Sequence, residues 1–157
     1  MSTEQVKHLK TESGMRIVLE RIPHVRSCSI GVWVNRGSLQ EPVEKVGISH
    51  LLEHMVFKGT SRRDVKEIAN SIESVGGSLD AFTSREFTCF HAKVLDEYTN
   101  YALDVLADLI DSPCIAEDQL AREKQVVYEE IRNMEDTPDD LIHQLYSETI
   151  WGGGPLG

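Results

Sequence analysis

Two histidines and a glutamate lie within five residues of one another in the segment GISHLLEHMVFKGT, residues 47–60. At about 100° per residue, Glu53 and His54 flank His50 on one face of a helix. The other directions of this helix are apolar, and such a helix is normally buried. Burying a carboxylate and two imidazoles without partners would cost several kcal/mol. The pattern therefore indicates a site in which these groups are neutralised and coordinated.

Two interpretations of the H-x-x-E-H pattern remain open from this helix alone. One is a hydrogen-bonded polar cluster in the core, in which a backbone carbonyl satisfies each histidine. The other is a metal site, because histidines at i and i+4 can direct their ring nitrogens to one divalent ion, as zinc ligands on helices do. A third ligand is needed to decide between them.

The segment EDQLAREKQVVYEEIRNM, residues 117–134, supplies candidates for that third ligand. Its apolar helical arc comprises Leu120, Val126, Val127, Ile131 and Met134. Glu123 and Glu130 fall inside this arc, whereas Glu129 faces the opposite direction. Glu130 is the expected ligand, since two histidines, one glutamate and a water form a catalytic zinc set. Both glutamates could instead edge the stripe and reach water, and for Glu123 this alternative stays open.

The elements that must position these residues follow from periodicity and turn signals. We expect strands at 15–22, 28–35, 78–84 and 87–95, and helices from about 48, at 64–75, around 98–109, at 116–134 and at 138–150. Asp64 is expected to cap the start of the helix at 64–75, and Gly76-Gly77 to end it. Strands first, helices later and a helix between the strand pairs indicate an α+β sandwich with helices on one sheet.

Composition excludes several classes of function. The 157 residues, 40% hydrophobic, suit one globular domain. The net charge of −10, with no basic stripe, argues against nucleic acid as a partner. The apolar runs are too short to span a membrane. Three scattered cysteines and a polar N-terminus without a secretory signal predict a reducing, cytoplasmic location.

Five segments in order carry a family resemblance: SIGVWVNRGSLQE, GISHLLEHMVFKGT, GGSLDAFTSREFTCFHAKVL, REKQVVYEEI and GGGPLG. They resemble the N-terminal part of zinc peptidases of the pitrilysin and insulysin superfamily, whose inverted zincin motif is H-x-x-E-H. The most similar branch is that of the bacterial processing-protease-like proteins related to the mitochondrial processing peptidase β subunit. The resemblance implies an α+β metallohydrolase domain with a mixed, mainly antiparallel sheet and helices packed on one face.

At the residue level, the resemblance implies that His50, His54 and Glu130 bind one zinc ion. It further implies that Glu53 is the general base of a metalloendopeptidase acting on peptides or presequence-like segments. Glu123 matches an acid that supports the ligands without binding the metal.

The strand at 78–84 matches the exposed edge on which the substrate peptide lies in this family. The expected substrate contacts are therefore Asp80, Ala81, Phe82 and Thr83. The family usually has asparagine where Asp80 stands. An ionised aspartate cannot donate a hydrogen bond, so one backbone contact to the peptide is expected to change.

The family also implies partners, because it builds a peptidase from two or more such domains facing each other across a chamber. Residues 1–157 are expected to form an incomplete N-terminal domain that needs a C-terminal domain or a second subunit, for which a second copy of the chain is one candidate. Alone, the chain is expected to bind zinc but to cleave peptides weakly or not at all. Two alternatives are a non-catalytic, peptide-binding partner subunit and a scaffold with a purely structural metal.

Overall fold

The computed structural model describes residues 6–152 and 156. Its elements are β1 (Val6–Lys10), β2 (Arg16–Glu20), β3 (Ser27–Val34), α1 (Ile48–Val56), α2 (Val65–Glu73), β4 (Ser78–Thr83), β5 (Thr88–Leu95), α3 (Thr99–Asp111), α4 (Glu117–Asp136) and α5 (Pro138–Trp151), with short 3-10 turns at Ser38–Gln40, Val43–Lys45 and Asp96–Tyr98. The expected α+β class is confirmed. Within the described part of the chain, no helix has both the length and the apolar character that a bilayer crossing requires.

The main sheet has three antiparallel strands in the order β3-β5-β4. Its central strand alternates as the sequence predicts: Phe90, Ala92 and Val94 are buried, whereas His91 and Lys93 lie on the opposite face. In the described residues β4 therefore pairs on one side only, and it forms an edge of this sheet.

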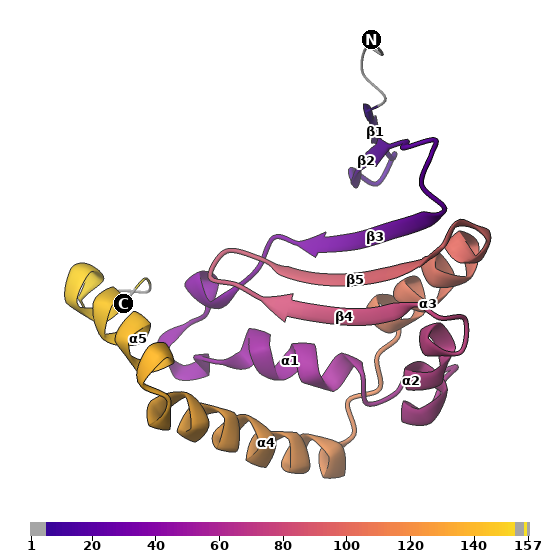
Figure 1. Cartoon of the computed structure of the whole chain (residues 1–157). Coiled ribbons are helices and arrows are strands. Elements are labelled where there is room, and N and C mark those ends of the chain that lie inside the picture. Colours follow the sequence, from indigo (N-terminus) through magenta and orange to yellow (C-terminus); the bar gives the residue numbers. More distant parts are fainter. Residues whose placement is uncertain (1–5, 153–155, 157) are drawn as a thin grey trace.

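Helices cover one face of the main sheet, as predicted (Figure 1). α3 packs on β3 and β5, and α2 packs on β4 and α3. Buried apolar side chains of the core come from both helices and from β5: Ile68, Ile72, Phe90, Ala92, Val94, Ala102, Val105, Leu106 and Leu109. α1 runs beside β4, and α4 lies on the far side of α1, so α1 is held between the edge strand and α4.

The ends of α2 follow the predicted signals. The Asp64 side chain accepts a hydrogen bond from Glu67 N, and the Glu67 side chain accepts one from Asp64 N, which completes a capping box. After the helix, Gly76 has a φ of 73°. Gly77 is also required, because a Cβ there would lie 2.5 Å from the Lys93 carbonyl oxygen. This turn brings β4 directly against β5.

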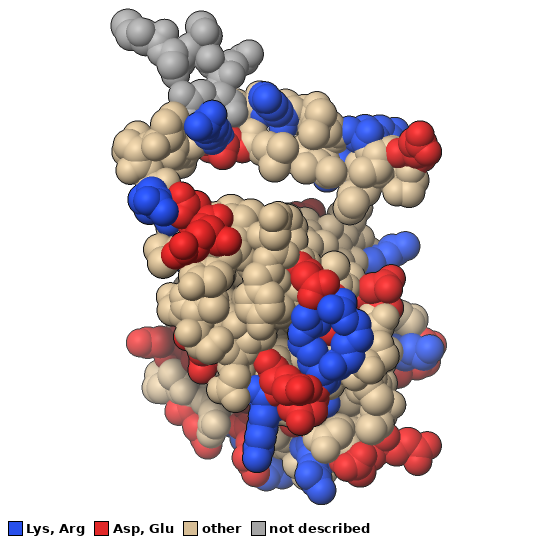
Figure 2. Space-filling view, turned by 90° about the vertical axis from the view of Figure 1, so that its right-hand side faces the viewer, with Lys and Arg blue, Asp and Glu red and all other residues tan. Residues whose placement is uncertain are grey.

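The prediction of a single sheet is wrong. β2 pairs with β1 in a separate two-stranded sheet rather than with β3, and this hairpin lies apart from the rest of the chain (Figures 1 and 2). β1 was not predicted, because its sequence VKHLK has too few apolar residues to stand out. The tight turn at residues 11–15, with Gly14 at a φ of 93°, pairs β2 with β1 locally. On the face of the molecule that Figure 2 shows, acidic side chains lie among the basic ones, and the basic side chains form no continuous stripe.

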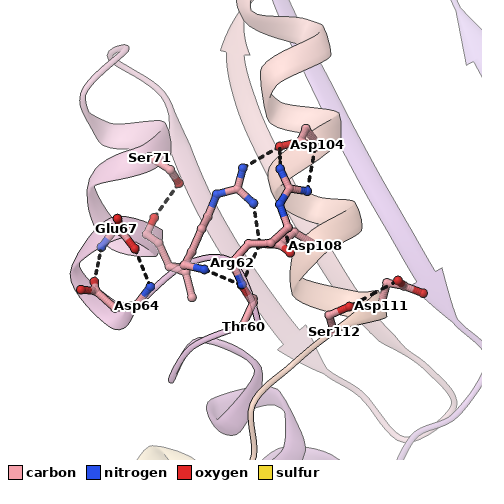
Figure 3. A network of polar contacts seen from close by, with 11 residues as sticks. Thr60, Arg62, Asp64, Glu67, Ser71, Asp104, Asp108, Asp111 and Ser112 are labelled. Carbon is pink, nitrogen blue, oxygen red and sulfur yellow. Dashed lines mark hydrogen bonds and ion pairs between the residues drawn. The ribbon is translucent and has the colours of Figure 1, made fainter.

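An ion-pair cluster fixes the loop after α1 to α3 (Figure 3). Asp108 is buried and accepts hydrogen bonds from Thr60 Oγ1, at 2.8 Å, and from the Arg63 guanidinium. Arg62 and Arg63 also both pair with Asp104. Burial raises the pKa of Asp108, but the hydrogen bonds from Thr60 and Arg63 outweigh burial, and its pKa lies below the ordinary value.

Replacing Asp108 with asparagine should lower the free energy of unfolding by about 2 kcal/mol, because half-buried Arg63 loses one of its two charged partners. Because the folded-state pKa is depressed, the charge of Asp108 stabilises fully above its ordinary pKa of 3.8, and this contribution disappears as pH falls through the lower folded-state pKa. Urea unfolding of the parent and Asp108→Asn at several pH values should therefore give a difference that shrinks in acid. Asp104→Asn, at a more exposed position, is the matched control and should cost less; equal losses would contradict this account.

Candidate metal centre

The start of α1 is fixed by a carboxylate. Glu41 Oε2 accepts a hydrogen bond from Gly47 N and Oε1 accepts one from Ser49 N, both at 2.7 Å. These bonds satisfy two of the free N–H groups at the helix N-terminus. Burial raises the pKa of Glu41, but the hydrogen bonds from Ser49 and Gly47 outweigh burial and hold its pKa below the ordinary value. Gly47 adopts a φ of 88°, which favours glycine, and His50 follows within the first turn of α1.

Three side chains from α1 and α4 direct one atom each to a common point. His50 Nε2 and His54 Nε2 are 3.2 Å apart, and Glu130 Oε2 lies 3.6 Å from the former and 3.5 Å from the latter. This is the one group of three or more potential metal ligands that the described residues bring together. Zinc–ligand bonds of about 2.0–2.1 Å in a tetrahedron place the ligand atoms about 3.3–3.4 Å apart. The three donor atoms therefore fit a tetrahedral zinc ion.

The other ring nitrogen of His54 has a partner of its own. Its Nδ1 lies 3.3 Å from Glu123 Oε2, and Glu123 Oε1 lies 2.7 Å from Lys58 Nζ. Since a carboxylate only accepts, Nδ1 carries the proton and donates, which leaves the Nε2 lone pair free to bind a metal. Burial raises the pKa of Glu123, but the hydrogen bonds from Lys58 and His54 outweigh burial, and its pKa lies below the ordinary value.

Glu53 lies on the same face of α1 as the two histidines. Its carboxylate is held by β4, whereas His54 is held by α4. The Thr83 hydroxyl, at the end of β4, donates to Glu53 Oε2 at 2.5 Å. Thr83 Oγ1 also lies 3.4 Å from Thr88 Oγ1, and the Thr88 hydroxyl donates to the Arg36 carbonyl. The carboxylate of Glu53 is thus oriented by the edge strand of the sheet.

Along β4, exposure alternates, with Asp80 and Phe82 exposed and Ala81 and Thr83 half-buried. Asp80 Oδ1 accepts a hydrogen bond from Ala81 N at 2.9 Å. The Phe82 and Trp33 rings pack edge to face, with their centroids 6.0 Å apart, on the face of the sheet away from the helices. Of the four residues predicted to contact a peptide, Thr83 is the one that forms a side-chain hydrogen bond to α1 in the described residues.

The site is more open than the sequence predicts. In α1 only Met55 is buried, while Ile48 and Leu52 are 37% and 43% exposed. The side chain of Glu130 is 46% exposed, although its position in an apolar arc predicted burial. The reason is that β4 and α4 together cover only part of α1, and the apolar residues of α4 itself remain partly exposed.

Sequence reasoning missed two contacts at this site. Lys58 was not considered, although it lies four residues after His54, a spacing that places both on one face where the helical turn continues. Thr83 was expected to contact a peptide, and its hydroxyl also holds Glu53. One contact joins the segment after α1 to α4 and the other joins α1 to β4, so helical periodicity within α1 could not reveal them.

Comparison with known proteins adds the family. Residues 16–157 match the family model described as Insulinase (Peptidase family M16). The chain is 53% identical over 152 residues to an uncharacterized zinc protease of Bacillus subtilis, YmxG. The aligned region covers 97% of this chain and 37% of that protein. It is 38% identical, over its whole length, to 30% of a protein of Arabidopsis thaliana named a probable mitochondrial-processing peptidase subunit beta. The chain thus spans about a third of the length of these relatives.

Solved structures agree with the fold. The crystal structure of a protease from Helicobacter pylori superposes with a TM-score of 0.82 at 27% identity, covering 87% of this chain and 33% of that one. A peptidase M16 inactive domain from Pseudomonas fluorescens gives a TM-score of 0.85 at 19% identity, over 98% of this chain and 37% of that one, and so supports the fold alone. From the family match over residues 16–157 and these relatives, the chain belongs to the insulinase family of peptidases, Peptidase family M16.

Proposed function

We propose that this chain carries the zinc centre and the general base of an endopeptidase that hydrolyses unstructured peptide segments, presequence-like ones among them. The observation that carries the proposal is the spacing of His50 Nε2, His54 Nε2 and Glu130 Oε2, between 3.2 and 3.6 Å, which suits one tetrahedral zinc ion per chain. The names of the relatives, zinc protease and processing peptidase, support the same reaction class.

In this proposal each residue of the centre has one task. His50, His54 and Glu130 hold the ion, and Glu123 keeps the His54 ring in the orientation that directs Nε2 inward. A zinc ion with three protein ligands supplies a Lewis acid and lowers the pKa of a water in its open position.

Glu53 is the proposed general base, which takes the proton from the attacking water. It suits this task because it shares the helix face of both histidines and yet is not one of the three converging ligands. The Thr83 hydroxyl holds one of its oxygens, Oε2, so the other can face the water. A hydrogen bond that fixes the carboxylate reduces the reorganisation that proton transfer requires.

The substrate is proposed to add to the free edge of β4 as a further strand. Backbone pairing holds a peptide with little dependence on its sequence. The contacts would come from Asp80, Ala81, Phe82 and Thr83, and Thr83 would place the scissile bond beside Glu53. Because Asp80 already accepts a hydrogen bond from Ala81 N, a peptide carbonyl must compete with it for this donor.

The complete activity is proposed for a longer assembly. Residues 1–157 would be its N-terminal zinc domain, working with a C-terminal domain or a second subunit, of which a second copy of the chain is one form; one relative is itself named a subunit. The isolated chain is expected to bind zinc and to cleave peptides weakly or not at all. Its three free cysteines are in keeping with a cytoplasmic location.

Glu130→Gln should weaken zinc binding because it removes a direct ligand. The loss of affinity should exceed the roughly 10–100-fold loss that follows when a residue hydrogen-bonded to a ligand is changed. Competition of the chain with a zinc chelator measures the dissociation constant. Glu129→Gln is the matched control, since this neighbouring glutamate is exposed and lies outside the ligand group. Equal effects of the two changes would exclude Glu130 as a ligand.

Glu53→Gln in the complete protein should lower kcat by about 10²–10⁴-fold while zinc stays bound, because only the proton acceptor is lost.

Thr83→Val should lower kcat by about tenfold, because the hydrogen bond to the charged Glu53 carboxylate is lost. Thr83→Ser, which keeps the hydroxyl, should retain activity. Hydrolysis of an unstructured peptide, with metal content measured on the same samples, tests both residues. Unchanged activity of the whole complex after Glu53→Gln would favour the alternative in which this chain is a non-catalytic, peptide-binding partner subunit.

Peptides methylated on alternate backbone nitrogens should test binding to the β4 edge. In an antiparallel pair only every second N–H points to the neighbouring strand. Two methyl groups on those nitrogens should weaken binding to the complete Glu53→Gln protein on the order of thirtyfold. The same peptide methylated on the intervening nitrogens is the control, and the affinities can be measured by calorimetry. Identical affinities for the two peptides would rule out strand addition.

A further inference from the structure

We propose that Lys58 is a positioning residue of the metal centre, which acts through Glu123 on the orientation of His54. The inference rests on the proposed zinc site and assigns a role to a residue outside the H-x-x-E-H pattern. Lys58 follows the end of α1, where its backbone N–H donates to the Met55 carbonyl at 3.0 Å. It therefore lies about one turn beyond His54, on the side from which Glu123 approaches.

The contacts form a continuous chain from Lys58 to the metal-facing nitrogen. Lys58 Nζ lies 2.7 Å from Glu123 Oε1, and Glu123 Oε2 lies 3.3 Å from His54 Nδ1. Each oxygen of the Glu123 carboxylate thus has a different partner. One partner, His54, lies in the last turn of α1, and the other, Lys58, lies just after this helix. With its two oxygens bound in this way, the Glu123 carboxylate has a fixed plane, and the His54 ring is held in a fixed orientation.

Burial makes this arrangement dependent on Lys58. Glu123 is the buried residue of α4, with a side chain only 8% exposed, and the Lys58 side chain is 27% exposed. Among the described residues, the side-chain partner left to the buried Glu123 carboxylate would be the neutral His54 imidazole, which compensates its charge poorly. Without the ammonium group, Glu123 would turn toward water or rearrange, and His54 Nδ1 would lose its acceptor. The ring would then be free to rotate away from the position in which Nε2 meets His50 and Glu130.

The alternative role for Lys58 is purely structural, namely to join the end of α1 to α4. The two roles differ in what they change. A structural link alters the stability of the metal-free fold, whereas a positioning role alters zinc affinity in chains that are equally well folded. Arginine should largely preserve the positioning role, since it also places a permanent positive charge against the carboxylate.

The test is zinc affinity of the full 157-residue chain, measured by competition with a chelator, alongside thermal unfolding of the metal-free chain. Lys58→Met, which keeps an apolar stem of similar length, should weaken zinc binding by about tenfold, at the lower end of the effect of an outer partner. Lys58→Arg should restore affinity to within about threefold of the parent. Lys124→Met, which removes the same charge from an exposed position next to Glu123 in sequence, should leave affinity unchanged.

A double-mutant cycle keeps the proposal falsifiable if Lys58→Met also destabilises the fold. In a Glu123→Gln background, Lys58→Met should cause little further loss of zinc affinity, because the residue through which Lys58 acts is already changed. Additive losses, or a Lys58→Met chain that binds zinc as tightly as the parent, would overturn the role of Lys58 and leave the zinc site intact. A parent chain that binds no zinc would overturn the proposed metal centre itself, and the role of Lys58 with it.

Discussion

The candidate centre depends on how firmly α1 is held between the sheet edge and α4. Three carboxylates hold this nine-residue helix at three places. Glu41 caps its first turn, Glu123 bonds His54 and Lys58 at its other end, and its own Glu53 is bonded by Thr83 of β4. Each bond ties α1 to a different part of the chain. Together they compensate for the small apolar surface that such a short helix buries.

The same contacts separate the charges of the site by task. The carboxylate of Glu130 is half exposed and has no cation among its partners in the described residues, so its charge is available to an ion. The carboxylate of Glu123 is buried and paired with Lys58, so its charge is already compensated. Two glutamates seven residues apart on one helix therefore differ in environment, and the difference arises from what lies opposite each of them on α1.

Periodicity predicted most of the fold because most elements have one clear apolar face. The alternation of Phe90, Ala92 and Val94 placed β5, and the cap at Asp64 with the glycines at 76 and 77 placed α2. The same reasoning failed for β1, whose charged sequence VKHLK forms a strand only because the turn at Gly14 brings it against β2. Local pattern reports what a segment can bury, and β1 buries little.

At the site, the sequence predicted which residues would meet but not how they would be held. The i, i+4 spacing of His50 and His54 and the helical arc of α4 were sufficient to select Glu123 and Glu130. The bonds from Lys58 and Thr83 are contacts between elements, and their existence depends on the distance of α1 from α4 and β4. The exposure of Glu130 and Leu52 could not be predicted for the same reason. A helical arc shows which way a side chain points, but it does not show how much of that side chain a neighbouring element covers.

The two halves of the centre lie far apart along the chain, because Glu123 follows His54 by 69 positions. The intervening residues form α2, the β4–β5 hairpin and α3. During synthesis the histidines leave the ribosome well before α4, the helix that carries Glu123 and Glu130. In the proposed zinc site, metal loading would therefore follow the docking of α4 against α1 and would report it.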